Sequence, residues 1–260
     1  MAVMINVENN INLISVNTEG HRHMVQRVIP FLKERQPEVV LLQDCYERGF
    51  KMVADGLGLE PAFAPHERRK LYFDHGDIEI CGVATLSRYG FTDKDIFYYV
   101  RDGEPDLPMH QEFMNRPGEE VARLRRAALL TGVAKGSNRF RFANVYFTWT
   151  PDGQASSYQR KDLQILLDYL GIFSEVILCG DFNAPRGREI FDRIATVYQD
   201  NIPVEVLSTL DPLLHNAARR KDLQLVVDGL FTTPGYCASE VKVVSGVSDH
   251  CAIVANIHRV

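Results

Sequence analysis

Apolar and polar positions alternate along the chain in two periods, which predict strands and helices in turn. Residues 11–17 alternate apolar with polar side chains and residues 39–42 are all apolar, so both segments are predicted to be strands. Between them, apolar side chains at helical spacing predict a helix over residues 22–36, in which Pro30 marks the place for a kink. A strand, a crossover helix and a second strand favour a sheet with helices packed against it.

The rest of the chain continues this mixture. Helical periodicity predicts helices over residues 47–57, 158–170 and 188–195. Apolar or alternating runs predict further strands, at residues 62–64, 71–73, 80–86, 97–100, 126–134, 140–147, 176–179, 223–231, 241–244 and 252–255. Residues 101–120 hold acids and prolines with little periodicity, and we predict a long functional loop there. Because no linker, repeat or low-complexity tract divides the sequence, we expect one domain over residues 1–260.

The composition is that of an ordinary globular protein. With 45% apolar and 24% charged residues, the chain has enough of both for a core and a solvated surface. No apolar run approaches the roughly 20 residues that a membrane-spanning helix needs, and the N-terminus lacks the pattern of a secretion signal. The five cysteines are an odd number without CxxC spacing, which favours reduced thiols in apolar surroundings. We expect a cytoplasmic location and a monomer.

The charge balance limits how this protein can meet nucleic acid. A net charge of −5 and an isoelectric point near 5.9 argue against a protein that coats nucleic acid by bulk electrostatics. Short basic runs at residues 68–70, 123–126 and 219–221 are candidates for a local basic rim, although such runs are more often solvated faces.

Polar side chains stand at the ends of several predicted strands. In residues 178–183 the apolar strand ends at Gly180, Asp181 and Asn183; glycine permits close backbone approach, and the two side chains offer oxygen atoms. An Asp-x-Asn after a strand is also common turn chemistry. The same placement recurs at Asn17, Asp44, Asp228, Asp249 and His250. A group of carboxylates and amides with one histidine matches what a hard divalent cation needs.

In this order the strand-end residues resemble a known family. The elements that carry the resemblance are Asn17, Gln43-Asp44, Ser87-Arg88, Gly180-Asp181-Phe182-Asn183, Asp228 and Ser248-Asp249-His250. They are similar to the motifs of the endonuclease/exonuclease/phosphatase (DNase I-like) superfamily, over residues 11–257. The resemblance implies an α/β (α+β) fold, a four-layer sandwich of two mixed β-sheets packed face to face with helices outside. It also implies a phosphoric ester hydrolase that uses Mg²⁺ or Mn²⁺.

The resemblance assigns a metal-binding role to Asn17 and Asp44, with Asp249 completing the shell or lying just behind it. The family usually has glutamate where this chain has Asp44. The aspartate carboxylate lies one C–C bond, roughly 1.5 Å, nearer the backbone. Since magnesium prefers ligands at about 2.0–2.1 Å, the ion would have to shift, bind through water or be held weakly.

The resemblance assigns catalysis to four further residues. Asp181 and Asn183 would orient the attacking water and the phosphate. His250 would be the general base or an electrostatic clamp on the phosphate, and Asp228 would fix the tautomer of its ring. The chemistry is coherent, because a negatively charged phosphodiester repels hydroxide and needs both a cation and a positioned water.

Three other residues are predicted to bind substrate. Tyr146 is a further candidate for catalysis and departs from the usual pattern of the family. Many members have histidine where this chain has Tyr146, which could contact phosphate, stabilise the leaving oxygen, or merely finish a strand. Trp149, the only tryptophan, could stack on a base or sugar, although packing explains it equally well. Arg88 and Arg126 are predicted to bind the anionic substrate.

Three functions compete at this stage. The first is a divalent-metal-dependent phosphodiesterase acting on DNA or RNA. The second is a phosphatase or phosphodiesterase of a small molecule or lipid, which the acidic isoelectric point favours slightly. The third is a non-catalytic binding module on the same fold, against which the retained strand-end residues argue.

Overall fold

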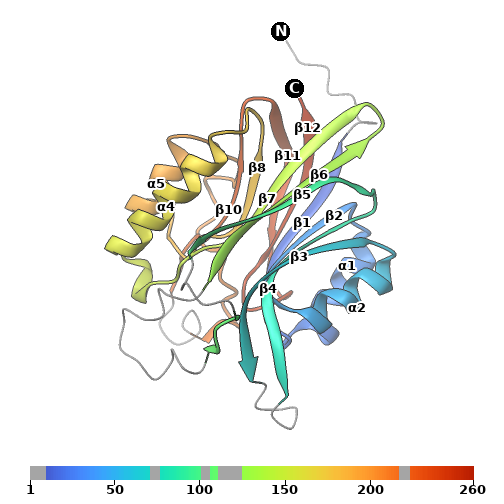
Figure 1. The fold of residues 1–260 in the computed structure, drawn as a ribbon, viewed down its shortest axis with the longest axis horizontal. Coiled ribbons are helices and arrows are strands. Elements are labelled where there is room, and N and C mark those ends of the chain that lie inside the picture. The colour runs from blue at the N-terminus through green and yellow to red at the C-terminus, as the bar shows by residue number, and fades with distance from the viewer. Residues whose placement is uncertain (1–9, 71–76, 101–105, 111–124, 217–222) are drawn as a thin grey trace.

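Two mixed β-sheets of six strands each form the centre of the molecule, and helices cover their outer faces (Figure 1). This computed structural model describes residues 10–70, 77–100, 106–110, 125–216 and 223–260. The first sheet has the spatial order β11 (Tyr236–Val244), β12 (Ala252–Arg259), β1 (Ile11–Gly20), β2 (Val39–Tyr46), β4 (Ile78–Ser87) and β3 (Glu60–Lys70). The second has the order β5 (Phe91–Val100), β6 (Arg126–Lys135), β7 (Asn138–Tyr146), β8 (Ile177–Asp181), β10 (Asp228–Thr232) and β9 (Gln199–Asp200).

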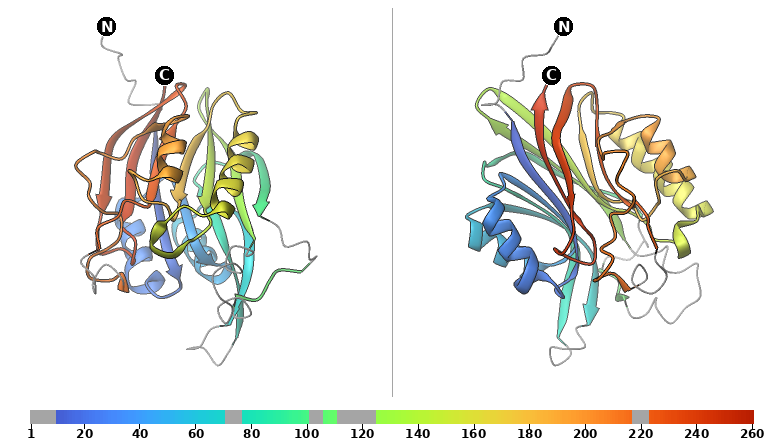
Figure 2. Two further views of the ribbon diagram at one scale, coloured as in Figure 1. Left: turned by 90° about the vertical axis from the view of Figure 1, so that its left-hand side faces the viewer. Right: turned by 180° about the vertical axis from the view of Figure 1, so that it is seen from behind.

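Helices complete four layers. The π-helix η2 (Met24–Val28), α1 (Ile29–Arg35) and α2 (Glu47–Leu57) lie on the outside of the first sheet. The short 3₁₀ helix η4 (Pro151–Gly153) precedes α4 (Ser157–Leu170), which with α5 (Glu189–Ala195) covers the second sheet, so that the sheets lie between two helical layers (Figure 2). The predicted fold class is therefore confirmed. The predicted helix over residues 22–36 is divided where Pro30, at the start of α1, lacks the N–H that would continue the turns before it.

The core explains why β1 and β2 are apolar on both faces. Ile11 and Leu13 of β1 pack between the sheets, against side chains such as Phe142, whereas Ile14 and Val16 pack beneath the helices. The apolar run that starts β2 divides in the same way, as expected of strands buried on both sides. All five cysteines are free thiols, and four of them are buried.

Some predicted elements differ from the observed ones. Only Asp228–Thr232 of the predicted strand over residues 223–231 is a strand. β3 and β5 extend well beyond the short strands predicted at residues 62–64 and 97–100. The strand predicted at residues 71–73 lies outside the described residues. The long loop predicted at residues 101–120 also lies outside them, apart from residues 106–110. Among the helices that the structure describes, none combines the length and the apolar composition required to cross a bilayer.

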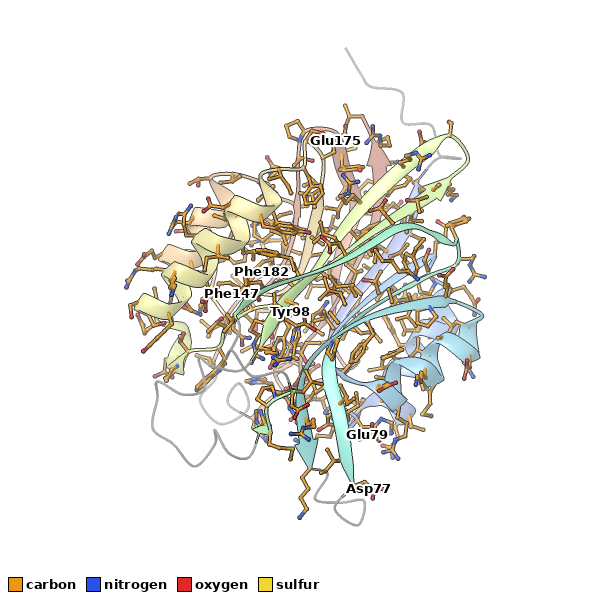
Figure 3. All side chains as sticks on the ribbon, in the orientation of Figure 1. Asp77, Glu79, Tyr98, Phe147, Glu175 and Phe182 are labelled. Carbon is orange, nitrogen blue, oxygen red and sulfur yellow. The ribbon has the colours of Figure 1, made fainter. Side chains whose placement is uncertain are left out.

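The topology brings the predicted site together at one end of both sheets. β1 and β2 are parallel, so their carboxyl ends coincide, and β12, which is antiparallel to β1, starts beside them. In the second sheet Tyr146, Asp181 and Asp228 are direct neighbours across β7, β8 and β10. Phe147 and Phe182 lie in the core just beyond this end, whereas Glu175 lies beyond the other end of β8 (Figure 3).

A buried acid on α4 gives a prediction for stability. Asp162 is 7% exposed and accepts a 2.7 Å hydrogen bond from Thr148 Oγ1, and burial raises the pKa of its carboxyl to about 6. An acid whose pKa is higher in the folded than in the unfolded state costs nothing below about pH 4, and its cost grows up to about pH 6. We therefore expect Asp162→Asn to leave stability unchanged at pH 4 and to raise it at pH 7.5.

The expected gain in the free energy of unfolding at pH 7.5 is about 1–2 kcal/mol. It is smaller than the pKa shift alone would give at roughly 1.4 kcal/mol per unit, because water screens the edge of this carboxylate. Urea unfolding at both pH values measures it. Equal stabilities of the two proteins at pH 7.5 would show that Thr148 and solvent fully compensate the charge.

Candidate active site

Four side chains form a continuous polar chain across the gap between the two sheets. Asn17 Nδ2 donates a 2.8 Å hydrogen bond to Asp181 Oδ2, which joins the end of β1 to the end of β8. His250 Nε2 lies 4.0 Å from the same oxygen, and its Nδ1 lies 2.9 Å from Asp228 Oδ2. All four residues are at least nine-tenths buried. Residues from opposite halves of the sequence thus meet at one point, poised around one carboxylate.

The backbone around Asp181 needs its glycine. Gly180 has φ +145°, and a Cβ there would lie 2.0 Å from the carbonyl oxygen of Val145. The loop that follows is held by Asn183, whose N–H donates to Asp181 Oδ1 at 2.8 Å and whose Nδ2 donates to the Phe147 carbonyl oxygen at 2.9 Å. The strand end therefore aims Asp181 Oδ2 at Asn17 and His250.

Irregular backbone positions the other side of the site. Glu19, Asp44 and Asn183 all have φ between 45° and 49°, a left-handed conformation that side chains rarely adopt. The pairing register shifts between Asn17 and Gly20 in β1 and between Leu42 and Cys45 in β2. Bulges of this kind redirect side chains, and such strain gathers at functional sites.

The electrostatics of Asp181 and His250 are coupled. Burial raises the pKa of the Asp181 carboxyl to about 7. Burial also disfavours the charged imidazole, but the carboxylates of Asp228 and Asp181 outweigh it and hold the pKa of His250 well above its usual value. At neutral pH the site therefore contains a charged imidazole beside a carboxylate that can gain or lose a proton. Such matched groups are characteristic of proton-transfer sites.

Three more carboxylates gather at the ends of adjacent strands. Glu19 ends β1, Asp44 lies near the end of β2, and Asp249 precedes β12. Burial raises the pKa of Asp249 to about 6, and the nearby carboxylates of Glu19 and Asp44 add to this effect. Asp44 Oδ1 also lies 2.8 Å from Arg69 Nη2 and accepts a contact from the Cys81 thiol at 3.1 Å.

Tyr146, Arg126 and Trp149 line the same end of the second sheet. The guanidinium carbon of Arg126 lies 4.8 Å from the centre of the Tyr146 ring, and the Arg126 side chain is 3% exposed. Burial raises the pKa of the Tyr146 hydroxyl well above its usual value, so the hydroxyl stays protonated. Trp149, in the segment after β7, is 47% exposed.

The comparisons with known proteins agree with this geometry. Residues 10–250 match the model of the endonuclease/exonuclease/phosphatase family. The chain belongs to this family. The prediction from the strand-end motifs is thereby confirmed, and the match covers every element that contributes to the polar chain. Members of the endonuclease/exonuclease/phosphatase family are usually phosphoester hydrolases that use divalent metals.

Solved structures of the same fold include proteins with different stated activities. An endonuclease/exonuclease/phosphatase from Bacteroides vulgatus is 16% identical, with a TM-score of 0.71 over 96% of this chain and 99% of its own. D. rerio TDP2, complexed with a single-strand DNA product, is 14% identical with a TM-score of 0.67 over 96% and 99%. A mannosyl-6-phosphatase from Bacteroides thetaiotaomicron is 13% identical with a TM-score of 0.65 over 95% and 99%. Comparison with proteins of curated function finds no match to this sequence.

Asp44 and Asp249, from the end of β2 and the start of β12, each belong to a group that could hold a metal ion: Asp44 with Glu67 and Cys81, and Asp249 with His215 and His250. The carboxylates of Glu19 and Asp44 add to the raised pKa of Asp249, and carboxylate oxygens are ligands that suit Mg²⁺ or Mn²⁺. Asp44 has one oxygen paired with Arg69. Asn17 is the third predicted ligand. Its Nδ2 donates a hydrogen bond to Asp181, and its Oδ1 accepts one from the N–H of Glu19.

One predicted residue lies elsewhere. Arg88 follows β4, whose last residue Ser87 pairs with Val39 at the beginning of β2. Because β4 is antiparallel to β2, Arg88 is at the opposite end of the sheet from Asp44, and its guanidinium lies 3.5 Å from Gln36 Oε1. Arg88 therefore lies apart from the strand ends where Asn17 and Asp181 meet.

Other residues join the site without having been predicted. Glu19 follows Asn17 at the same strand end, so its position could have indicated it. Glu67 and Arg69 come from the charged end of β3, which was interpreted as a solvated basic run. His215 lies against the His250 ring, with centroids 5.8 Å apart, and burial lowers its pKa to about 4; no periodicity or motif marked it.

Proposed function

We propose that this protein is a divalent-metal-dependent hydrolase of phosphoester bonds, and that its substrate is a phosphodiester of nucleic acid. The observation that supports hydrolysis is the buried chain that runs from Asn17 through Asp181 and His250 to Asp228. It combines a proton acceptor, Asp181, with the charged imidazole of His250 and with Asp228, which orients that imidazole. All three lie near a group of carboxylates. A buried carboxylate with a pKa near neutrality, beside a histidine and a second carboxylate, favours a catalytic site over a binding module.

The proposed roles follow from the protonation states. Asp181, whose pKa burial raises to about 7, accepts the proton of the attacking water. Asn17 and Asn183 orient the Asp181 carboxylate for this transfer. The charged imidazole of His250 stabilises negative charge on a phosphate oxygen, and Asp228 holds the ring in place from its Nδ1 side. A divalent cation, when bound, neutralises charge on the phosphate oxygens.

Two features on the β7 side support a nucleic-acid substrate. The buried Arg126 guanidinium stacks on Tyr146 and adds positive charge to this side of the site, and the exposed Trp149 ring can stack on a base. We propose that Tyr146, whose hydroxyl stays protonated at neutral pH, donates to the leaving oxygen. This arrangement serves a local phosphate contact, which is compatible with the acidic net charge of the chain.

A second candidate substrate is a phosphoester that carries an apolar group. The segment after β9 exposes Val204, Leu207 and Leu213, which are 87%, 67% and 75% exposed. Leu210 of the same segment forms a β-bridge with His250. A cavity of about 410 Å³, lined by residues that include Leu207, Leu210 and Cys251, lies beside it. An apolar chain bound there would place its phosphate next to His250.

A metal titration tests whether the protein is an enzyme. With bis-p-nitrophenyl phosphate we expect hydrolysis in the presence of Mg²⁺ or Mn²⁺ and its loss on addition of EDTA, because the carboxylates alone repel the anionic phosphate. The release of nitrophenol measures it. Hydrolysis that persists unchanged in EDTA would contradict the metal dependence, and failure to hydrolyse any phosphoester under all metal conditions would leave the binding module as the better interpretation.

A pair of variants separates the two substrates. Trp149→Ala is expected to reduce cleavage of a single-stranded oligonucleotide by about 5- to 150-fold, which corresponds to the roughly 1–3 kcal/mol of a base–aromatic stack, and to leave bis-p-nitrophenyl phosphate hydrolysis unchanged. Leu207→Ser is the matched change on the opposite side of the site and should leave both unchanged. If Leu207→Ser instead impairs hydrolysis of an acyl-chain phosphodiester that the protein prefers to the oligonucleotide, the apolar substrate is the correct one.

A further inference from the structure

Arg69 links two buried carboxylates at the edge of the candidate metal site. Its Nη2 lies 2.8 Å from Asp44 Oδ1, and its Nε donates to Glu67 Oε1. The Arg69 side chain is 15% exposed and that of Glu67 is 1% exposed. The positive charge that pairs with Asp44 in this structure is therefore a guanidinium of the chain itself.

Glu67 has spare capacity to accept a hydrogen bond. Its Oε1 contacts Arg69 and lies 3.0 Å from His110 Nδ1. Its Oε2 is buried, has no hydrogen-bond partner among the residues that the structure describes, and lies 3.8 Å from Arg126 Nη1. A buried carboxylate oxygen without a donor is costly, and a second N–H of Arg69 there would complete the bidentate geometry that arginine and carboxylate favour.

We propose that Arg69 and the divalent cation compete for Asp44, and that Glu67 receives the guanidinium when the cation binds. This inference rests on the proposed function, since it takes Asp44, with Glu19 and Asp249, as the cation site. Arginine does not lose its proton in a protein, so it can yield Asp44 only by moving. Two cations on one partly buried carboxylate repel strongly, whereas Glu67 offers the displaced guanidinium a partner that it already touches.

Two features of Asp44 bear on this competition. An aspartate in place of the usual glutamate reaches less far towards the ion, and one of its oxygens is already paired with Arg69. The affinity of the site for the metal ion therefore depends on how much more strongly Asp44 interacts with the ion than with Arg69. Removing Arg69 frees the carboxylate for the ion, and removing the Glu67 acceptor traps Arg69 on Asp44.

Binding of Mn²⁺ to the full-length protein without substrate tests this inference, with the free ion followed by electron paramagnetic resonance. We expect Arg69→Met to bind Mn²⁺ about tenfold or more tightly than the wild type, in the usual range of coupling between two sites. Glu67→Gln is expected to bind more weakly than the wild type. Lys70→Met removes the neighbouring exposed charge from β3 and should stay within about twofold.

The outcomes distinguish this inference from the proposed function. Equal or weaker Mn²⁺ binding by Arg69→Met, with Lys70→Met unchanged, overturns the competition and leaves metal-dependent hydrolysis intact. The absence of Mn²⁺ binding in every protein overturns the metal dependence and the competition together. Arg69→Gln, which keeps a polar side chain, replaces the methionine variant if circular dichroism shows the latter unfolded.

Discussion

Asp181→Asn is expected to lower kcat for phosphoester hydrolysis by about 10²–10⁴-fold, the usual contribution of a positioned proton acceptor. The amide has nearly the shape of the carboxylate, but its single oxygen can accept only one of the two hydrogen bonds, from Asn17 Nδ2 or from the N–H of Asn183. It cannot take a proton from water. Steady-state kinetics at saturating Mg²⁺ measure the loss, and KM should change much less than kcat.

Asp200→Asn is the matched control for this substitution. Asp200 is a partly buried acid in the same sheet, paired with Arg186 at 2.8 Å, and burial raises its pKa too. It lies beside Phe231, three residues along β10 from Asp228. The kcat of the Asp200→Asn variant should equal that of the wild type. If Asp181→Asn keeps more than a tenth of the activity while Asp200→Asn behaves as the wild type, another group accepts the proton.

Two of the strands that sequence patterns predicted short, β3 and β5, are edge strands. β3 and β5 each lie at the end of a strand order. An edge strand tolerates proline and charge, because one side of its backbone needs no partner. Pro61 and Pro65 interrupt β3, and polar residues from Thr92 to Asp95 open β5, so neither shows the alternation of a half-buried strand. Central strands such as β2 and β8 were predictable because burial on both faces makes them apolar.

The same physical reason explains which site residues the sequence revealed. Asp181 and Asp228 follow apolar residues and His250 precedes an apolar run, so the change of polarity itself marks them. Glu67 and Arg69 lie within a charged run on an edge strand, and only the fold shows that they turn inward to Asp44. Arg88 also followed an apolar run, but the direction of β4 cannot be known before the strands are paired. Strand ends are visible in a sequence, and which ends share an edge is not.

His250→Ala is expected to lower kcat/KM by about 10²–10³-fold, the usual loss when one group that stabilises transition-state charge is removed. The imidazole lies between Asp181 and Asp228, at 4.0 Å and 2.9 Å, and both carboxylates favour its charged form. Without it, the charge on the phosphate loses its partner and two buried carboxylates face each other. The pKa of Asp181 should therefore rise further, since His250 lowers it in the wild type.

Asp228→Asn separates the charge of the ring from its presence. The amide can still hold Nδ1 in place, yet it no longer favours the imidazolium. The kcat/KM of Asp228→Asn should therefore lie between that of the wild type and that of His250→Ala. Thermal unfolding of all three proteins shows whether each remains folded. If Asp228→Asn matches the wild type while His250→Ala loses activity, the ring acts by its shape and hydrogen bonding, and the charge that Asp228 stabilises contributes nothing to the reaction.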